Sequence, residues 1–147
     1  MKQFFVLSLL TLIMLIILNC EKEKSKFPNS LKNTQWIINT GGLITPDGEQ
    51  TYNLSERDKT AFIYNFQAID FFDDKNFKSY DSWECGNDCF TAIFGTYYFT
   101  KLDQIQLKID SITSSGTCMA PTQIFKPYKV ITFNLSKEKT QLKLTRK

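Results

Sequence analysis

The most distinctive chemistry in this chain belongs to four cysteines, because the sequence contains no histidine. Cys85, Cys89 and Cys118 lie in the second half of the chain, and Cys20 follows an apolar segment. Three thiols can supply one disulfide and one free thiol, or join the thioether of Met119 to bind a soft metal ion such as copper(I). Zinc-type sites usually contain a second close cysteine pair or a histidine, so the disulfide is favoured and no metal or other cofactor is expected.

The residue types also argue against an enzyme. Without histidine, the chain has no Ser-His or Cys-His pair for nucleophilic catalysis. Asp73 and Asp74 stand where a hairpin turn favours aspartate, which explains the pair better than acid-base chemistry does. Acidic neighbours of Cys85 and Cys89 disfavour the thiolate and make these thiols poor nucleophiles. We therefore expect no catalytic residue.

The chemistry of the cysteines depends on the cellular compartment, and the N-terminal segment indicates that compartment. Residues 4–18 are apolar except for Ser8 and Thr11, and Lys2 precedes them. A helix that spans a bilayer usually needs about 20 apolar residues, so this run is short for a permanent anchor. A positive start followed by a short apolar run is typical of a signal peptide.

The end of this segment, Ile17-Leu18-Asn19-Cys20, resembles the lipobox of bacterial lipoproteins, although that pattern prefers Gly, Ala or Ser where Asn19 stands. The resemblance implies that residues 1–19 are a lipoprotein signal peptide and that Cys20 is acylated. The protein would then be anchored to a bilayer of the bacterial cell envelope and face the periplasm or the cell surface. An uncleaved membrane anchor is the alternative, and it also places the rest of the chain outside the cytoplasm.

Composition divides the remaining chain into a tether and one domain. Residues 20–30 are mostly charged or polar and cannot bury enough apolar surface to order themselves, so we expect a flexible tether after the lipidated cysteine. Residues 31–147 are long enough for a single domain. Without residues 1–19 the chain carries 17 basic and 15 acidic residues, a formal charge of +2, and the basic ones are dispersed. Nucleic acid is therefore not an expected partner.

Alternating apolar and polar residues predict antiparallel strands throughout this domain. The first strand covers residues 34–40, and a hairpin covers residues 66–83 with a turn near residues 73–76. The next two pairs are residues 94–100 with 104–112, about a turn at Leu102-Asp103, and residues 128–135 with 140–146, about a turn at residues 136–139. Seven or so such strands predict an all-β domain that closes as a small antiparallel meander barrel or a half-open barrel.

Two further details accompany this prediction. Ser55 followed by Asp58 has the spacing of a helix N-cap, which predicts one short helix near Ser55 to Ala61. The residues expected to face the core of the barrel alternate with polar ones along the strands, and they are Trp36, Phe72, Tyr97, Phe99, Leu107 and Leu142.

Several short motifs are similar to those of two families of small bacterial β domains. The segments "LKNTQWII", "IDFFDDKNFKSY" and "GTYYF" resemble lipocalin-like domains. The order "CGNDC", "FGTYYF", "QIQLKI" and "SGTCMA" resembles META-type domains, from which the chain departs in the spacing of its cysteine pair and in the extra "FTAI". Both resemblances imply a barrel without catalytic residues. The lipocalin-like one implies a small apolar ligand, for which Trp36, Tyr97 and Phe99 are the candidate contacts.

Strand register bears on the disulfide. If the apolar residues of segments 94–100 and 104–112 share a face, opposing positions sum to 204 or 206. Cys118 then lies opposite a neighbour of Cys85 or of Cys89, and a small bulge would bring the sulfur atoms together. This favours a bridge between Cys89 and Cys118, with Cys85 left free. Pairing of Cys85 with Cys118 or with Cys89 stays open.

Three functions fit the sequence. The favoured one is a membrane-anchored envelope lipoprotein whose non-enzymatic domain supports envelope integrity or an interaction with an unknown envelope protein. The second is a lipocalin-like carrier of a small apolar ligand, and the third is a soft-metal or redox sensor that uses Cys85, Cys89 and Cys118. Aromatic residues packed solidly in the core would favour the first function, and an aromatic-lined cavity would favour the second.

Overall fold

The computed structural model describes residues 27–58, 60–61, 64–83, 88–118 and 120–147. Among these residues the chain forms eight strands and no helix, so none of them belongs to a helix that could cross a membrane. The predicted signal peptide at residues 1–19, the acylation of Cys20 and the roles considered for Cys85 and Met119 fall outside the described residues.

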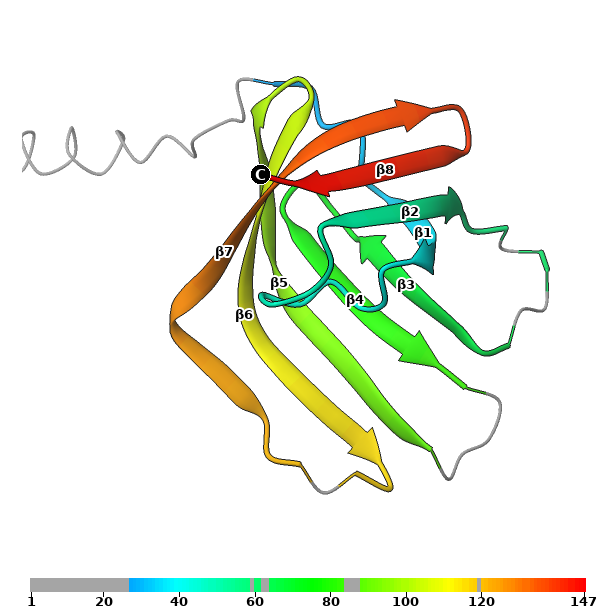
Figure 1. Cartoon of the computed structure of the whole chain (residues 1–147), viewed down its shortest axis with the longest axis vertical. Helices are drawn as coiled ribbons and strands as arrows, with labels where there is room; N and C mark the ends of the chain where they lie inside the picture. The colour runs from blue at the N-terminus through cyan, green and yellow to red at the C-terminus, as the bar shows by residue number, and fades with distance from the viewer. Residues whose placement is uncertain (1–26, 59, 62–63, 84–87, 119) are drawn as a thin grey trace, which may run out of the picture.

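The eight strands close into an antiparallel barrel (Figure 1). They are β1 Thr34–Thr40, β2 Thr51–Glu56, β3 Phe66–Phe71, β4 Asn76–Ser82, β5 Cys89–Lys101, β6 Gln104–Gly116, β7 Gln123–Glu138 and β8 Gln141–Arg146. Their order around the barrel is β1-β2-β8-β7-β6-β5-β4-β3. Strands β3 to β8 form a meander, and the β1–β2 hairpin closes the gap between β8 and β3. The predicted all-β barrel is confirmed in its closed form.

Strand alternation directs one set of apolar side chains into a single core. Trp36, Tyr97, Phe99, Leu107 and Leu142 belong to this buried cluster, as predicted. Removing such side chains from water is the main favourable term in folding.

The prediction for Phe72 is wrong, because its side chain is 51% exposed. Phe71 takes the core position with 1% exposure and lies opposite Phe77 in the β3–β4 ladder. Strand β3 ends at Phe71, and Phe72 begins the turn. Since successive side chains of a strand point to opposite faces, an error of one residue exchanges core for solvent.

The β5–β6 ladder follows the predicted register near its turn and then shifts. Tyr97 lies opposite Leu107, which gives the expected sum of 204. A bulge between Phe94 and Gly95 then shifts the pairing by one residue, so that Phe94 lies opposite Ser111. Gly95 suits this point because a Cβ atom there would collide with the carbonyl oxygen of Lys108.

The other predicted turns agree with the structure in part. Leu102-Asp103 does connect β5 to β6. The last turn is Lys139-Thr140 and not residues 136–139, because β7 continues to Glu138. Lys139 has a φ of 46°, in the left-handed region that tight two-residue hairpin turns use.

The short helix expected near Ser55 to Ala61 is absent from the described residues of that segment. Ser55 lies inside β2, opposite Ile37 of β1 and Gln141 of β8. Asp58 does cap a turn, because its Oδ1 atom accepts hydrogen bonds from the Thr60 amide at 2.8 Å and the Thr60 hydroxyl at 2.7 Å. The cap therefore belongs to a local turn after the strand.

The folded domain begins before Leu31. The Asn29 side chain donates to the Tyr97 hydroxyl at 2.9 Å and to the Asp74 carbonyl at 3.1 Å, and Phe27 packs against the core. Residues 27–30, which the sequence assigns to the flexible tether, are therefore part of the domain. Residues 27–147 contain all eight strands and the whole core cluster, so this part has what it needs to fold on its own.

Candidate functional site

The three candidate ligand contacts lie in the packed core. Trp36 of β1 and Tyr97 and Phe99 of β5 are 0%, 1% and 4% exposed. Trp36 Nε1 donates to the Thr34 hydroxyl at 2.8 Å, so its polar atom already has a partner within the protein. The structure brings the three residues into one buried apolar cluster.

Tyr97 is bound on all sides by the domain itself. Its hydroxyl donates to the Asp73 carbonyl at 2.6 Å and accepts from Asn29, and its ring meets the Phe71 ring edge-on with centroids 4.7 Å apart. Burial raises the pKa of Tyr97 to about 12, so the phenol is neutral at physiological pH. This residue ties the β3–β4 turn and the first described residues to β5, which is a structural role.

The connection between β1 and β2 also fills the interior. Ile44 in this connection is fully buried and belongs to the core cluster. The Arg146 guanidinium donates to three of its carbonyls, those of Thr45 at 3.0 Å, Pro46 at 2.8 Å and Glu49 at 3.3 Å. Bonds from a charged donor are stronger than neutral ones, so this arginine holds Ile44 in the core.

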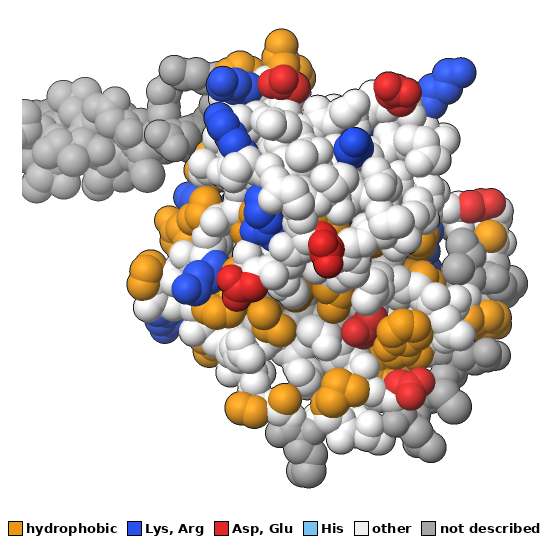
Figure 2. Space-filling model, viewed as in Figure 1, with side chains coloured by type: hydrophobic (Ala, Val, Ile, Leu, Met, Phe, Trp, Pro, Cys, Tyr) orange, Lys and Arg blue, Asp and Glu red, His pale blue; other side chains and the backbone are white. Residues whose placement is uncertain are grey.

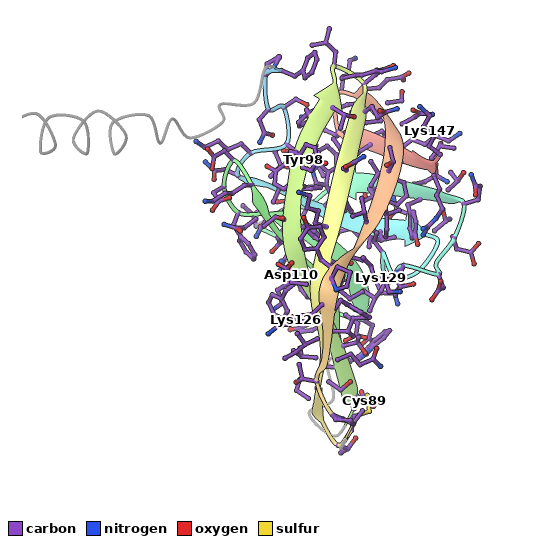
Figure 3. The ribbon with its side chains drawn as sticks, turned by 90° about the vertical axis from the view of Figure 1, so that its left-hand side faces the viewer. Cys89, Tyr98, Asp110, Lys126, Lys129 and Lys147 are labelled. Carbon is purple, nitrogen blue, oxygen red and sulfur yellow. A yellow bond between two sulfur atoms is a disulfide. The ribbon has the colours of Figure 1, made fainter. Side chains whose placement is uncertain are left out.

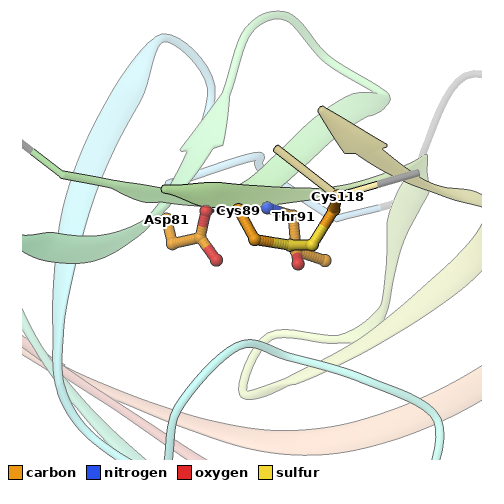
Figure 4. The surroundings of a disulfide bond; sticks show 4 residues. All are labelled: Asp81, Cys89, Thr91 and Cys118. Atoms are coloured by element: carbon orange, nitrogen blue, oxygen red, sulfur yellow. Dashed lines mark hydrogen bonds between the residues drawn. A yellow bond between two sulfur atoms is a disulfide. The ribbon is translucent and has the colours of Figure 1, made fainter. Parts of the chain in front are cut away.

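The disulfide joins Cys89 at the start of β5 to Cys118 after β6, with Cα atoms 4.9 Å apart (Figure 4). This confirms the favoured pairing. The Thr91 amide beside it donates to Asp81 Oδ1 at 2.7 Å, and burial raises the pKa of the Asp81 carboxyl. The bridge lies at the tip of the β5–β6 ribbon, where Figure 3 places Cys89.

The disulfide is incompatible with a soft-metal site that uses the thiolates of Cys85, Cys89 and Cys118 together. Cys89 and Cys118 are joined as a disulfide, so neither offers a thiolate to a metal ion. Among the described residues no group of three or more Cys, His, Asp or Glu side chains could hold a metal. Cys85 and Met119, the other proposed ligands, fall outside those residues.

Exposed apolar side chains gather on the outer surface of β5, β6 and β7. They share an outward position in neighbouring strands, and they are Phe94, Tyr98, Ile124, Tyr128 and Val130, exposed by 36%, 36%, 65%, 46% and 50%. Their alternation partners Ile93, Tyr97 and Ile131 point inward and are buried. We call this surface, together with Lys78 and Lys108, the lysine–aromatic face.

Two lysines lie among the rings of this face. The Lys108 ammonium is 4.9 Å from the Tyr98 ring centroid and 5.0 Å from that of Tyr128. The Lys78 ammonium is 4.8 Å from the Tyr80 centroid and 5.6 Å from that of Phe94. Such contacts are attractive, and they fix positive charge among exposed apolar groups. Figure 2 shows hydrophobic and basic side chains side by side along the edge that β6 and β7 form.

A buried carboxyl group lies beside this face on β3. Asp70 is 6% exposed, and its Oδ2 atom accepts hydrogen bonds from Gln35 at 3.0 Å and from the Tyr80 hydroxyl at 3.2 Å. Arg57 donates to the same hydroxyl at 3.0 Å. The Oδ1 atom of Asp70 is buried without a hydrogen-bond partner among the described residues. Burial raises the pKa of Asp70, and the bonds from Tyr80 and Gln35 together with the charge of Arg57 oppose that rise.

Asp70→Asn is expected to change how stability depends on pH. Because the pKa of Asp70 is raised in the folded state, its contribution is fully present below the unfolded pKa and is lost as the pH rises through the folded pKa. The free energy of unfolding of the wild type, relative to the variant, should therefore fall between acidic and neutral pH. Urea unfolding of both proteins across this range measures the difference, and a constant difference would contradict the prediction.

Sequence reasoning missed both the lysine–aromatic face and the Asp70 cluster. Alternation in β5 does point Phe94 and Tyr98 away from Tyr97, which is a usable signal. The contribution of Ile124 depends on the shift of the β6–β7 register between Ile109 and Ser111, which no local pattern reveals.

The outer wall also has a shallow depression near the β7–β8 turn. Its volume is about 200 Å³, and it is lined mainly by polar side chains of β2, β7 and β8, including Asn53, Glu138 and Lys143. Ligand sites for small apolar molecules are usually concave, larger and mostly apolar, so this depression does not suit such a ligand.

The fold and these surfaces define a closed eight-stranded antiparallel β-barrel with a buried apolar cluster inside and a disulfide at one tip. No family model, no curated protein and no solved structure matches this chain.

Proposed function

We propose that this chain is a lipid-anchored protein of the bacterial cell envelope whose barrel is a non-enzymatic interaction domain. One observation carries the proposal. The interior aromatic residues have their partners within the core, whereas exposed apolar side chains gather on the lysine–aromatic face. Aromatic side chains that are packed in the core favour recognition through the outer surface over transport of a ligand inside.

The N-terminal sequence supports the anchor. The apolar residues 4–18 end at Cys20, and the described domain begins at Phe27. Each acyl methylene buried in a bilayer contributes about 0.8 kcal/mol, so several chains on one cysteine hold a protein firmly. The seven residue steps from Cys20 to Phe27 span at most about 25 Å when extended, which keeps the barrel close to the membrane surface.

Cys20→Ser is expected to abolish acylation. Cells that express the wild type in the presence of a fatty-acid probe should incorporate the label into the protein, and cells that express the variant should not. Cys85→Ser is the matched control and should keep the label, because it removes a thiol from the domain and not from the lipobox. Equal labelling of the wild type and Cys20→Ser would refute the anchor.

A further inference from the structure

We propose that the lysine–aromatic face docks on an anionic lipid bilayer. This inference deepens the proposed function and rests on it, because the anchor would hold the barrel near such a surface. It assigns a binding partner to the exposed lysine–aromatic face, which the lipid anchor by itself does not explain.

The face combines the two properties that an interfacial surface needs. Tyr98 and Tyr128 are exposed rings with a polar tip, a kind of side chain enriched where membranes meet water. Ile124 and Val130 beside them are exposed aliphatic residues, which gain by entering the boundary between head groups and acyl chains. Exposed aliphatic side chains favour contact with acyl chains over contact with a polar ligand such as a sugar.

Charge selects anionic lipid. The lysine–aromatic face holds the ammonium groups of Lys78 and Lys108, and Asp110 is the one acidic residue of β6. Lys126 is exposed on the same part of β7 as Tyr128, and Figure 3 turns this side of the molecule toward the viewer. Basic side chains near an anionic membrane surface each contribute about 1 kcal/mol to binding.

The exit of the chain places this face within reach of the bilayer. Asn29 bonds to the inward-pointing Tyr97 of β5 and to the Asp74 carbonyl of the β3–β4 turn, so the chain reaches the barrel at this end of β5, the strand whose outer surface carries Phe94 and Tyr98. A tether that short converts docking into an intramolecular event with a high effective concentration. The tether therefore strengthens a docking that the face provides by itself.

The test uses residues 27–147, which contain the whole core and lack Cys20. This domain should sediment with phosphatidylcholine vesicles that include phosphatidylglycerol, but not with vesicles of phosphatidylcholine alone. Raising the salt concentration to about 1 M, where the Debye length falls to about 3 Å, should release it. Lys108→Glu should weaken binding at least about five-fold, since each charge removed counts separately.

Two further variants make the result decisive. Lys143→Glu carries the same charge change on the outer wall of β8, among the polar side chains Asn53 and Ser136, and should leave binding unchanged. Tyr128→Ser removes an exposed ring and should weaken binding without changing the urea midpoint.

Two outcomes would overturn the inference. The first is a wild-type domain that ignores anionic vesicles, or one that loses binding equally with Lys108→Glu and Lys143→Glu. The second is a dimer, formed without vesicles and dissociated by Lys108→Glu, which would assign the face to a second copy of the chain. Neither result affects the labelling of Cys20, so failure of the face and failure of the anchor are distinguishable.

Discussion

Phe71→Ala is expected to lower the free energy of unfolding by about 3–5 kcal/mol, the usual cost of deleting a buried phenyl ring. The ring is 1% exposed, lies opposite Phe77 and packs edge-on against Tyr97. Its removal leaves a cavity between β3, β4 and β5 that the closed sheet cannot collapse to fill. Urea unfolding followed by circular dichroism measures the loss.

Phe72→Ala is the matched control, because it makes the same chemical change one residue further along the chain. Its side chain is 51% exposed, and exposed substitutions usually change stability by about 0.5 kcal/mol or less. The pair therefore reports which phenylalanine faces the core. A loss in free energy of unfolding for Phe72→Ala that equals or exceeds the loss for Phe71→Ala would contradict the assignment of Phe71 to the core face of β3.

This pair also illustrates what alternation can and cannot predict. The run from Ile69 to Phe72 contains one polar residue among three apolar ones, so either phenylalanine could occupy the core phase. The phase is decided by the partner strand, because Phe71 faces Phe77 across the β3–β4 ladder. A long-range pairing therefore settles what the local pattern leaves ambiguous.

Strand β2 escaped prediction for a related reason. Its six residues place only Tyr52 and Leu54 in the core, and polar residues fill the outward positions. Two apolar residues give too short a pattern to identify a strand, and Ser55 with Asp58 imitates a helix cap. The strand forms because β1 and β8 pair with it on both sides.

The halves of β5 and β6 nearest their turn were predicted from alternation, whereas residues 89–93 and 113–116 of these strands were not. Ile105, Leu107 and Ile109 alternate with polar residues without interruption, which sets the register near the turn. The lysine–aromatic face needed more than this pattern, since its residues come from several strands whose outward positions become neighbours only through the pairing of β4, β5, β6 and β7. The Asp70 cluster is similar, because Gln35 and Arg57 reach Asp70 from other parts of the fold.

Loss of the disulfide is expected to lower the free energy of unfolding by about 3–4 kcal/mol, the chain-entropy estimate for a loop of roughly 30 residues. Cys89 and Cys118 are 29 positions apart, and the loop they close contains the whole β5–β6 hairpin. Without the bridge the unfolded chain regains the freedom of that loop. Cys89→Ser/Cys118→Ser should therefore unfold at lower urea than the wild type, and a reductant should destabilise the wild type to a similar extent.

Local structure at the tip makes the same substitution visible in a second measurement. Beyond Ile112 of β6 the β7 ladder has ended, and before Ala92 of β5 the β4 ladder has not begun, so the tip is a two-stranded ribbon. Such a ribbon is marginally stable by itself, and the bridge pins its end. Hydrogen exchange of the tip amides, such as that of Phe90, should speed up in the double variant, while amides near Leu107 stay protected until global unfolding. Cys85→Ser is the control, and it should keep both the urea midpoint and the hydrogen-exchange protection of the tip amides. An oxidised wild type that unfolds at the same urea concentration as the double variant would refute a stabilising bridge.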